Sequence, residues 1–173
     1  MNRLAIVILL FFNTNIHAQR FLASNGEISF FSEAPLEDIS AINKDVSAVY
    51  DASTTNLVFQ LNITDFIFPK ALMQEHFNEN YLESDIYPTS NFSGKVIDNK
   101  DGNTTVEGDL TIHGKTNKVK VNGVLIQNEK SVLITAEFVV ILDDYNIDIP
   151  TIVMYKIAQQ IDVRVNITLK KVE

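Results

Sequence analysis

Two histidines and a few spaced carboxylates are the side chains best suited to acid–base or metal chemistry. His76 and Glu79 lie three residues apart within residues 69–83, so on a helix they would share one face. Two ligands are too few for a zinc site, and the His-Glu-x-x-His spacing is absent. His113 precedes a glycine in a polar turn, where we expect a surface or capping role. No nucleophile accompanies either histidine, so no catalytic residue is assigned, and an enzyme using His76 or His113, such as a small hydrolase, stays as an alternative.

The remaining charged residues favour solvated surfaces over reactive sites. Glu75, Glu79 and Glu83 are spaced along one face of a helical segment, and Asp143 and Asp144 form an acidic pair. No metal site and no cofactor is predicted from them. The chain contains no cysteine, which excludes disulfides and thiolate chemistry. Its formal net charge of −8 disfavours binding to nucleic acid and to anionic membrane surfaces.

The first eighteen residues are typical of a secretory signal peptide. Arg3 precedes the unbroken apolar run of residues 4–12, and Ala18 offers a small residue before a cut. The run is too short for a membrane-spanning helix, which needs roughly 20 apolar residues. We therefore expect residues 19–173 to form one exported domain, periplasmic or secreted, without stable membrane insertion.

Alternation of apolar and polar residues dominates the rest of the chain. The clearest alternating segments are residues 56–64, 105–113, 118–126 and 161–170, and weaker candidates are residues 26–33, 46–51, 91–98 and 131–142. A period of two places one face of a strand in an apolar interior and the other in water. Short polar turns join the later segments, which favours sequential antiparallel strands. The sequence thus predicts an all-β fold with an eight-stranded antiparallel barrel, and a two-sheet sandwich is the rival arrangement.

Residues 69–83 break the alternation and predict a helix between the third and fourth strands. Pro69 suits the first position of a helix, and Met73, Phe77 and Tyr81 recur every four residues on one side. A second, shorter helical turn is expected at residues 151–158.

In a barrel, the apolar faces and the helix would enclose a lumen that can either be filled by side chains or hold an apolar ligand. The residues alone leave both possibilities open. The candidate ligand-binding residues are Phe59, Leu61, Ile63, Phe66, Phe68, Leu72, Met73, Phe77, Phe92, Leu110, Phe138, Val163 and Val165.

Several motifs resemble those of the YceI-like family. They are residues 108–114 (GDLTIHG), residues 118–121 (KVKV), residues 73–81 (MQEHFNENY), the Tyr-Pro pair at 87–88 and residues 91–94 (NFSG). The resemblance implies an exported lipocalin-like barrel that binds a long apolar molecule, such as an isoprenoid, a quinone or a polyprenyl lipid, in its lumen. Residues 142–147 depart from the family pattern in lacking an arginine and a glycine.

The resemblance favours a binding protein over an enzyme. A stress-related surface protein that binds a protein partner is a further alternative, and the sequence leaves a homodimer open.

Overall fold

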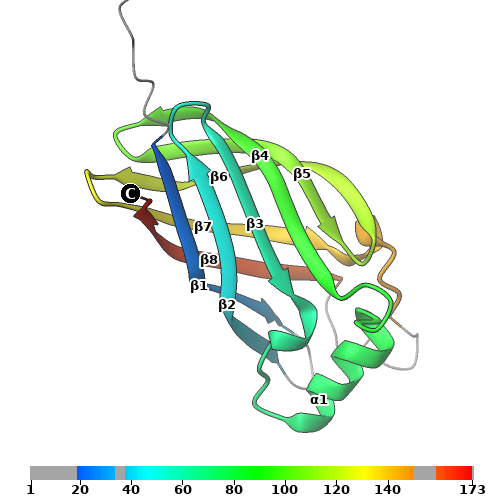
Figure 1. The fold of residues 1–173 in the computed structure, drawn as a ribbon. Helices are drawn as coiled ribbons and strands as arrows, with labels where there is room; N and C mark the ends of the chain where they lie inside the picture. The colour runs from blue at the N-terminus through cyan, green and yellow to red at the C-terminus, as the bar shows by residue number, and fades with distance from the viewer. Residues whose placement is uncertain (1–18, 34–37, 150–158, 173) are drawn as a thin grey trace, which may run out of the picture.

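The computed structural model describes residues 19–33, 38–149 and 159–172 (Figure 1). The expected signal peptide at residues 1–18 and the expected helical turn at residues 151–158 lie outside the described residues. Among those described, no helix is both long enough and apolar enough to cross a membrane.

Eight antiparallel strands form a closed barrel in the order of the sequence (Figure 1). The strands are β1 (Arg20–Ser32), β2 (Ile39–Asp51), β3 (Asn56–Asn62), β4 (Thr89–Lys100), β5 (Asn103–Ile112), β6 (Lys115–Gln127), β7 (Ser131–Ile141) and β8 (Gln160–Lys171). Pairing between β1 and β8 closes the wall, for example at Phe30 and Val163. The prediction of an eight-stranded barrel is therefore confirmed, and the two-sheet sandwich is excluded.

The first two strands are much longer than their sequence pattern indicates. Both span 13 residues, whereas alternation marks only residues 26–33 and 46–51. The register between them shifts on both sides of the Gly26–Val46 pair. An extra residue in a strand moves the side chains that follow to the opposite face, so alternation is interrupted where the strand continues.

A core of buried apolar side chains occupies the half of the barrel that lies away from the helix. We call it the packed half, and its most buried apolar residues, each 2% exposed or less, are Phe21, Val46, Ala48, Leu57, Val132, Ile167 and Leu169. Both ends of the described chain lie there, where the amide of Val172 donates to the carbonyl of Arg20 (Figure 1). Because these side chains leave almost no surface to water, this half has the close packing of a protein interior.

The predicted helix is confirmed in the connection between β3 and β4, but it begins at Ala71, so the expectation that Pro69 is its first residue is wrong. It consists of α1 (Ala71–His76), continued by the π-helical turn η2 (Phe77–Tyr81), and it lies at the other end of the barrel (Figure 1).

At this end two strand pairs separate, and short segments complete the wall. β2 pairs with β3 only from Ser47 onward. The gap next to it is bridged by Ile67, whose amide and carbonyl bond to the backbone of Ile42 at 2.9 and 3.1 Å. Asn43, fully buried, donates from Nδ2 to the carbonyl of Asn62 at 2.9 Å.

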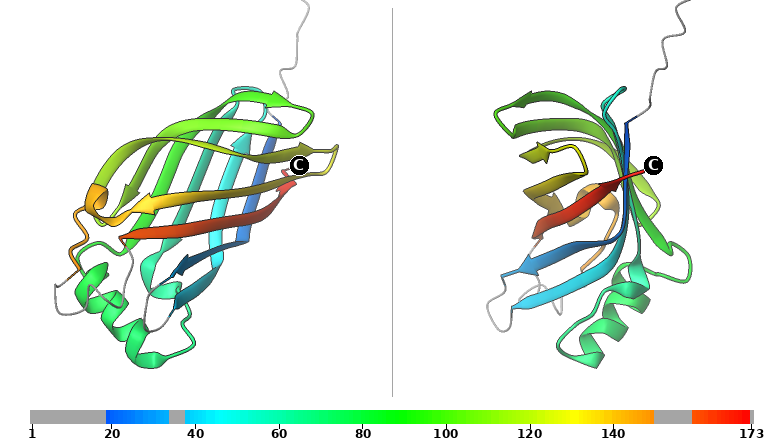
Figure 2. Two further views of the ribbon diagram at one scale, coloured as in Figure 1. Left: turned by 180° about the vertical axis from the view of Figure 1, so that it is seen from behind. Right: turned by 60° about the vertical axis from the view of Figure 1, so that its left-hand side comes forward.

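The second separation lies between β6 and β7. These strands pair only where Gly123–Gln127 meet Val132–Ala136, and they then diverge (Figure 2). The 3-10 turn η3 (Leu142–Tyr145) lies at the diverging end, where Asn117 Nδ2 of β6 donates to the carbonyl of Asp144 at 2.6 Å. The wall beside the helix is therefore made partly of irregular segments held by side-chain bonds.

Candidate ligand-binding pocket

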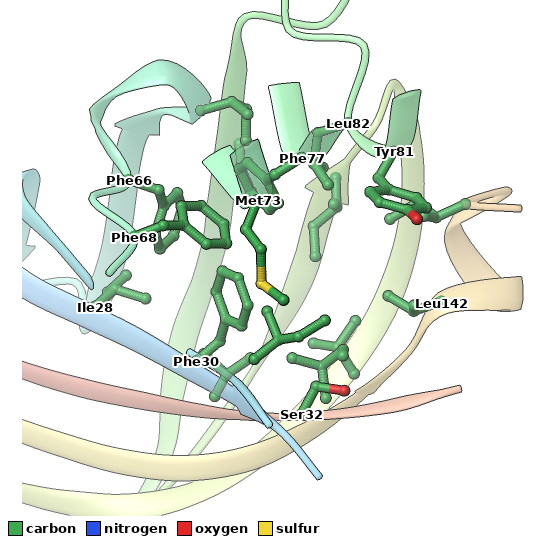
Figure 3. A pocket seen from close by; sticks show the side chains of 18 of the residues that line it. Ile28, Phe30, Ser32, Phe66, Phe68, Met73, Phe77, Tyr81, Leu82 and Leu142 are labelled. Atoms are coloured by element: carbon green, nitrogen blue, oxygen red, sulfur yellow. The ribbon is translucent and has the colours of Figure 1, made fainter. Parts of the chain in front are cut away.

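A cavity of about 540 Å³ occupies the helix end of the barrel (Figure 3). This volume lies within the roughly 300–1,000 Å³ of ordinary small-molecule sites. The lining residues are Ile28, Phe30, Ser32, Ile39, Leu61, Ile63, Phe66, Phe68, Leu72, Met73, His76, Phe77, Tyr81, Leu82, Ser90, Leu110, Ile112, Phe138, Val140, Leu142, Ile147, Ile149, Ile161 and Val163. They come from both the strands and the connections, and most of them are apolar.

Each contributing strand lines the pocket only near the end that faces the helix. On β1 the lining begins at Ile28, whereas Phe21 belongs to the packed half. On β8 it ends at Val163, whereas Ile167 and Leu169 are buried in the packed half. The described lining residues of the pocket therefore come from roughly one half of the barrel.

The segment after β7 replaces β6 in the pocket wall. Among the described residues, β6 contributes no lining side chain, and Leu142, Ile147 and Ile149 stand on that side instead. Leu142 and Ile147 are 9% and 2% exposed. The irregular sequence of residues 142–149 gave no sign of this role, because it depends on the separation of β6 from β7.

A cluster of four phenylalanines joins the helix to the barrel. The ring centroid of Phe77 lies 5.6 Å from that of Phe30, 5.6 Å from that of Phe66 and 4.9 Å from that of Phe68. Phe30 also packs edge-on against Phe66 at 5.4 Å. Figure 3 shows Met73 directed toward Phe30, beside Phe66 and Phe68. These contacts make one continuous aromatic wall from residues far apart in the chain.

Most of the residues predicted to bind a ligand line this cavity. They are Leu61, Ile63, Phe66, Phe68, Leu72, Met73, Phe77, Leu110, Phe138 and Val163. Leu72 stands at the rim and is 62% exposed. Phe59, Phe92 and Val165 are partly buried against the core but lie outside the lining. Alternation identifies the inward face of a strand, but it does not say how deep along the barrel a residue lies.

Sequence reasoning missed several lining residues. These include Ile28, Phe30 and Ser32 on β1, Ile39 on β2, and Ile112, Val140 and Ile161 near strand ends. For Ile112 and Ile161 the alternating pattern marked the inward face.

The polar side chains of the described lining are few: Ser32, His76, Tyr81 and Ser90. Ser90 donates from Oγ to the carbonyl of Thr111 at 2.8 Å. Burial raises the pKa of the Tyr81 phenol, so this hydroxyl stays protonated at neutral pH. Among the described lining residues there is no Lys, Arg, Asp or Glu. The arrangement suits an apolar molecule with a small uncharged polar group.

His113 lies outside the pocket lining and holds two parts of the surrounding wall together. Its Nε2 lies 2.8 Å from Glu83 Oε2, and its Nδ1 lies 3.3 Å from the carbonyl oxygen of Tyr145. The side chain is only 11% exposed. The turn position is confirmed, and the residue is half-buried because Glu83, Tyr145 and the ring of Tyr87, whose centroid lies 4.6 Å away, pack against the imidazole.

The two histidines that could serve acid–base or metal chemistry therefore lie in different environments. His76 is an exposed residue at the pocket, whereas His113 pairs with Glu83 outside it. In the described part of the chain, no three His, Asp or Glu side chains stand close enough together to hold a metal ion.

Comparisons with known proteins agree with this architecture. The family model of the YceI-like domain matches residues 12–169. A comparison with curated proteins gave no match.

Three solved structures illustrate the similarity of the fold. A polyisoprenoid binding domain from Saccharophagus degradans, implicated in plant cell wall breakdown, has a TM-score of 0.77 at 10% identity, covering 90% of this chain and 99% of that one. BcnA of Burkholderia cenocepacia has a TM-score of 0.73 at 14% identity, with 83% and 95% covered. The YCEI protein of Campylobacter jejuni has a TM-score of 0.64 at 16% identity, with 76% and 84% covered.

Proposed function

Because this chain belongs to the YceI-like domain family, we propose that it is an exported binding protein that holds a long apolar molecule in its barrel. The ligand class we propose is an isoprenoid, including the isoprenoid tail of a quinone or of a polyprenyl lipid. The observation that carries this proposal is the apolar cavity of about 540 Å³ at the helix end. The domain from Saccharophagus degradans that shares the fold is described as polyisoprenoid binding, which supports the same class of ligand.

Burial of hydrocarbon in this cavity provides enough free energy for useful affinity. Each buried methylene contributes about 0.8 kcal/mol. Micromolar binding requires about −8 kcal/mol, and association itself costs several kcal/mol more. A tail of a few isoprene units against the wall of Phe30, Phe66 and Phe77 satisfies both demands.

The ligand contacts that we propose are the lining residues from the strands and the helix. Leu61, Leu110, Phe138 and Val163 would surround the tail, while Met73 and Phe77 would cover it from the helix. An uncharged polar end, such as a hydroxyl or a quinone carbonyl, would lie near Tyr81. Absence of Lys and Arg from the described lining argues against a phosphate or carboxylate held inside the pocket.

Export is part of the proposal and depends on residues 1–18. The positive start, the short apolar run and Ala18 support cleavage by a signal peptidase and release of residues 19–173 into the periplasm or the medium. A binding protein located there would carry or sequester its ligand, without a catalytic step.

Native mass spectrometry of the purified protein, followed by organic extraction, tests the proposal. We expect an apolar molecule of isoprenoid mass to copurify or, after delipidation, a neutral prenol to bind with micromolar affinity. The substitution Val163→Phe should weaken binding at least about tenfold, because each methylene displaced from the cavity costs about fourfold. Val58→Phe, on the outer face where Val58 is 40% exposed, is the matched control. Absence of any bound apolar molecule, together with no measurable prenol binding, would refute the proposal.

A further inference from the structure

We propose that the pocket is blind and that Phe92, supported by Phe59, sets the greatest length of tail that the protein can bury. This inference rests on the proposed function and adds a limit to it. A tunnel open at both ends would accept tails of any length. A pocket closed at its inner end, which we call the floor, buries tails only up to a maximum length.

The packed half closes the interior beyond this floor. Leu57 on β3 and Val132 on β7 are 2% and 0% exposed. Ile167 and Leu169 on β8 are 1% and 0% exposed. Side chains this deeply buried leave no space for a hydrocarbon chain, so a tail that enters beside the helix must stop before them.

Phe92 and Phe59 lie between the pocket and the packed half. They are paired residues on β4 and β3, with ring centroids 6.3 Å apart. Leu61, two residues from Phe59, lines the pocket, and Leu57, two residues to the other side, belongs to the packed half. Phe92 is paired with the lining residue Leu110 on β5. Both rings thus sit at the level where the lining ends.

The ring of Phe92 occupies space that two glycines leave free. Gly94 on β4 and Gly108 on β5 are directly paired. A Cβ atom built on Gly94 would lie 2.5 Å from Phe92 Cζ, and one built on Gly108 would lie 2.8 Å from it. The phenyl ring therefore lies across two residues without side chains. If the ring is removed, the two glycines have no side chains that could fill its space. The pocket should then extend deeper into the barrel.

A homologous series of probes measures the depth directly. We would displace an apolar fluorescent dye from the full mature protein with straight-chain primary alcohols, from octanol to octadecanol. Affinity should rise by about fourfold for each added methylene while the tail still gains buried surface. It should then stop rising at the chain length at which the tail reaches Phe92.

Three variants move the floor and one leaves it in place. Phe92→Ala should shift the plateau to longer alcohols by several methylenes. Phe92→Leu should shift it by a smaller amount and keeps an apolar side chain in case the alanine variant does not fold. Leu110→Phe should raise the floor and shift the plateau to shorter alcohols. Phe31→Ala removes the same ring from an outward position that is 37% exposed and should leave the plateau unchanged.

The outcomes separate the two proposals. If no alcohol binds to the wild-type protein, the proposed function fails and the length limit fails with it. If affinity rises without a plateau up to octadecanol, ligand binding stands and the blind pocket is refuted. A plateau that neither the substitutions at Phe92 nor that at Leu110 displaces would show that another group forms the floor.

Discussion

His113 Nε2 lies 2.8 Å from Glu83 Oε2, and this pair joins the turn between β5 and β6 to the connection that follows the helical segment at the pocket. The other ring nitrogen faces the carbonyl oxygen of Tyr145 at the end of η3. Both partner atoms are acceptors, and a neutral imidazole donates from one nitrogen only. One side chain outside the pocket thus connects two segments that wall it.

Replacement of His113 by asparagine should loosen this connection. His113 has φ of 50°, a conformation that asparagine also tolerates, so His113→Asn removes the side-chain bonds with little added backbone strain. We expect the free energy of unfolding to fall by about 1 kcal/mol, below the roughly 1.5–3 kcal/mol of bonds to charged groups, because the Glu83 side chain is 44% exposed. Urea unfolding measures the loss. Glu83→Gln, which keeps an acceptor, should cost less, and an unchanged midpoint for His113→Asn would contradict the role of the pair.

Among the residues of the helix, Phe77 should contribute most to holding the helix against the barrel. Its ring contacts Phe30, Phe66 and Phe68, and Phe77→Ala should destabilise the protein by about 3 kcal/mol. Leu72→Ala on the same helix is the control, because Leu72 is 62% exposed and its loss should change stability by less than about 0.5 kcal/mol. Hydrogen exchange of the amides in residues 71–81 should accelerate only in the Phe77 variant. Equal effects of the two substitutions would argue against the aromatic attachment.

Gly108 is predicted to tolerate no side chain. A Cβ atom there would lie 2.5 Å from both Gly94 Cα and the carbonyl oxygen of Ser93, which are backbone atoms that cannot rotate away. Gly108→Ala should therefore lower the unfolding free energy by about 1–3 kcal/mol. Thermal unfolding followed by circular dichroism would measure it, with Glu107→Ala on the exposed face as the control. A stable alanine variant would mean that β4 and β5 separate more easily than their pairing indicates.

Alkaline pH should destabilise the protein through Tyr50. Burial, and secondarily the charge of Asp51, raise the pKa of this phenol in the folded state. The unfolded chain therefore loses the proton first, near the ordinary value of about 10, and stability falls as pH rises through and above that value. Tyr50→Phe should show a shallower decline in urea midpoint between neutral and strongly alkaline pH. Parallel declines in the two proteins would show that Tyr50 does not contribute to the effect.

The local pattern of residues was sufficient to predict the strands and their inward faces. Alternation placed Leu61, Leu110 and Val163 on the inner wall, and these residues line the pocket. The four-residue spacing of Met73, Phe77 and Tyr81 predicted the helix that is found at residues 71–81. Both predictions succeed because side-chain direction is set by the backbone of the few neighbouring residues.

Relations between distant segments were not predictable in this way. Bulges hid the true length of β1 and β2, and His113 meets partners 30 and 32 residues away. Phe59 and Phe92 share the inward face with the lining residues, yet they are not part of the described lining.

The sequence by itself therefore determined which residues face inward and where the helix interrupts the strands. Only the tertiary structure decided how deep each residue lies, which gaps in the wall are covered, and where the cavity ends. Depth depends on how eight staggered strands close on one another, and a pattern of neighbouring residues contains no information about that closure.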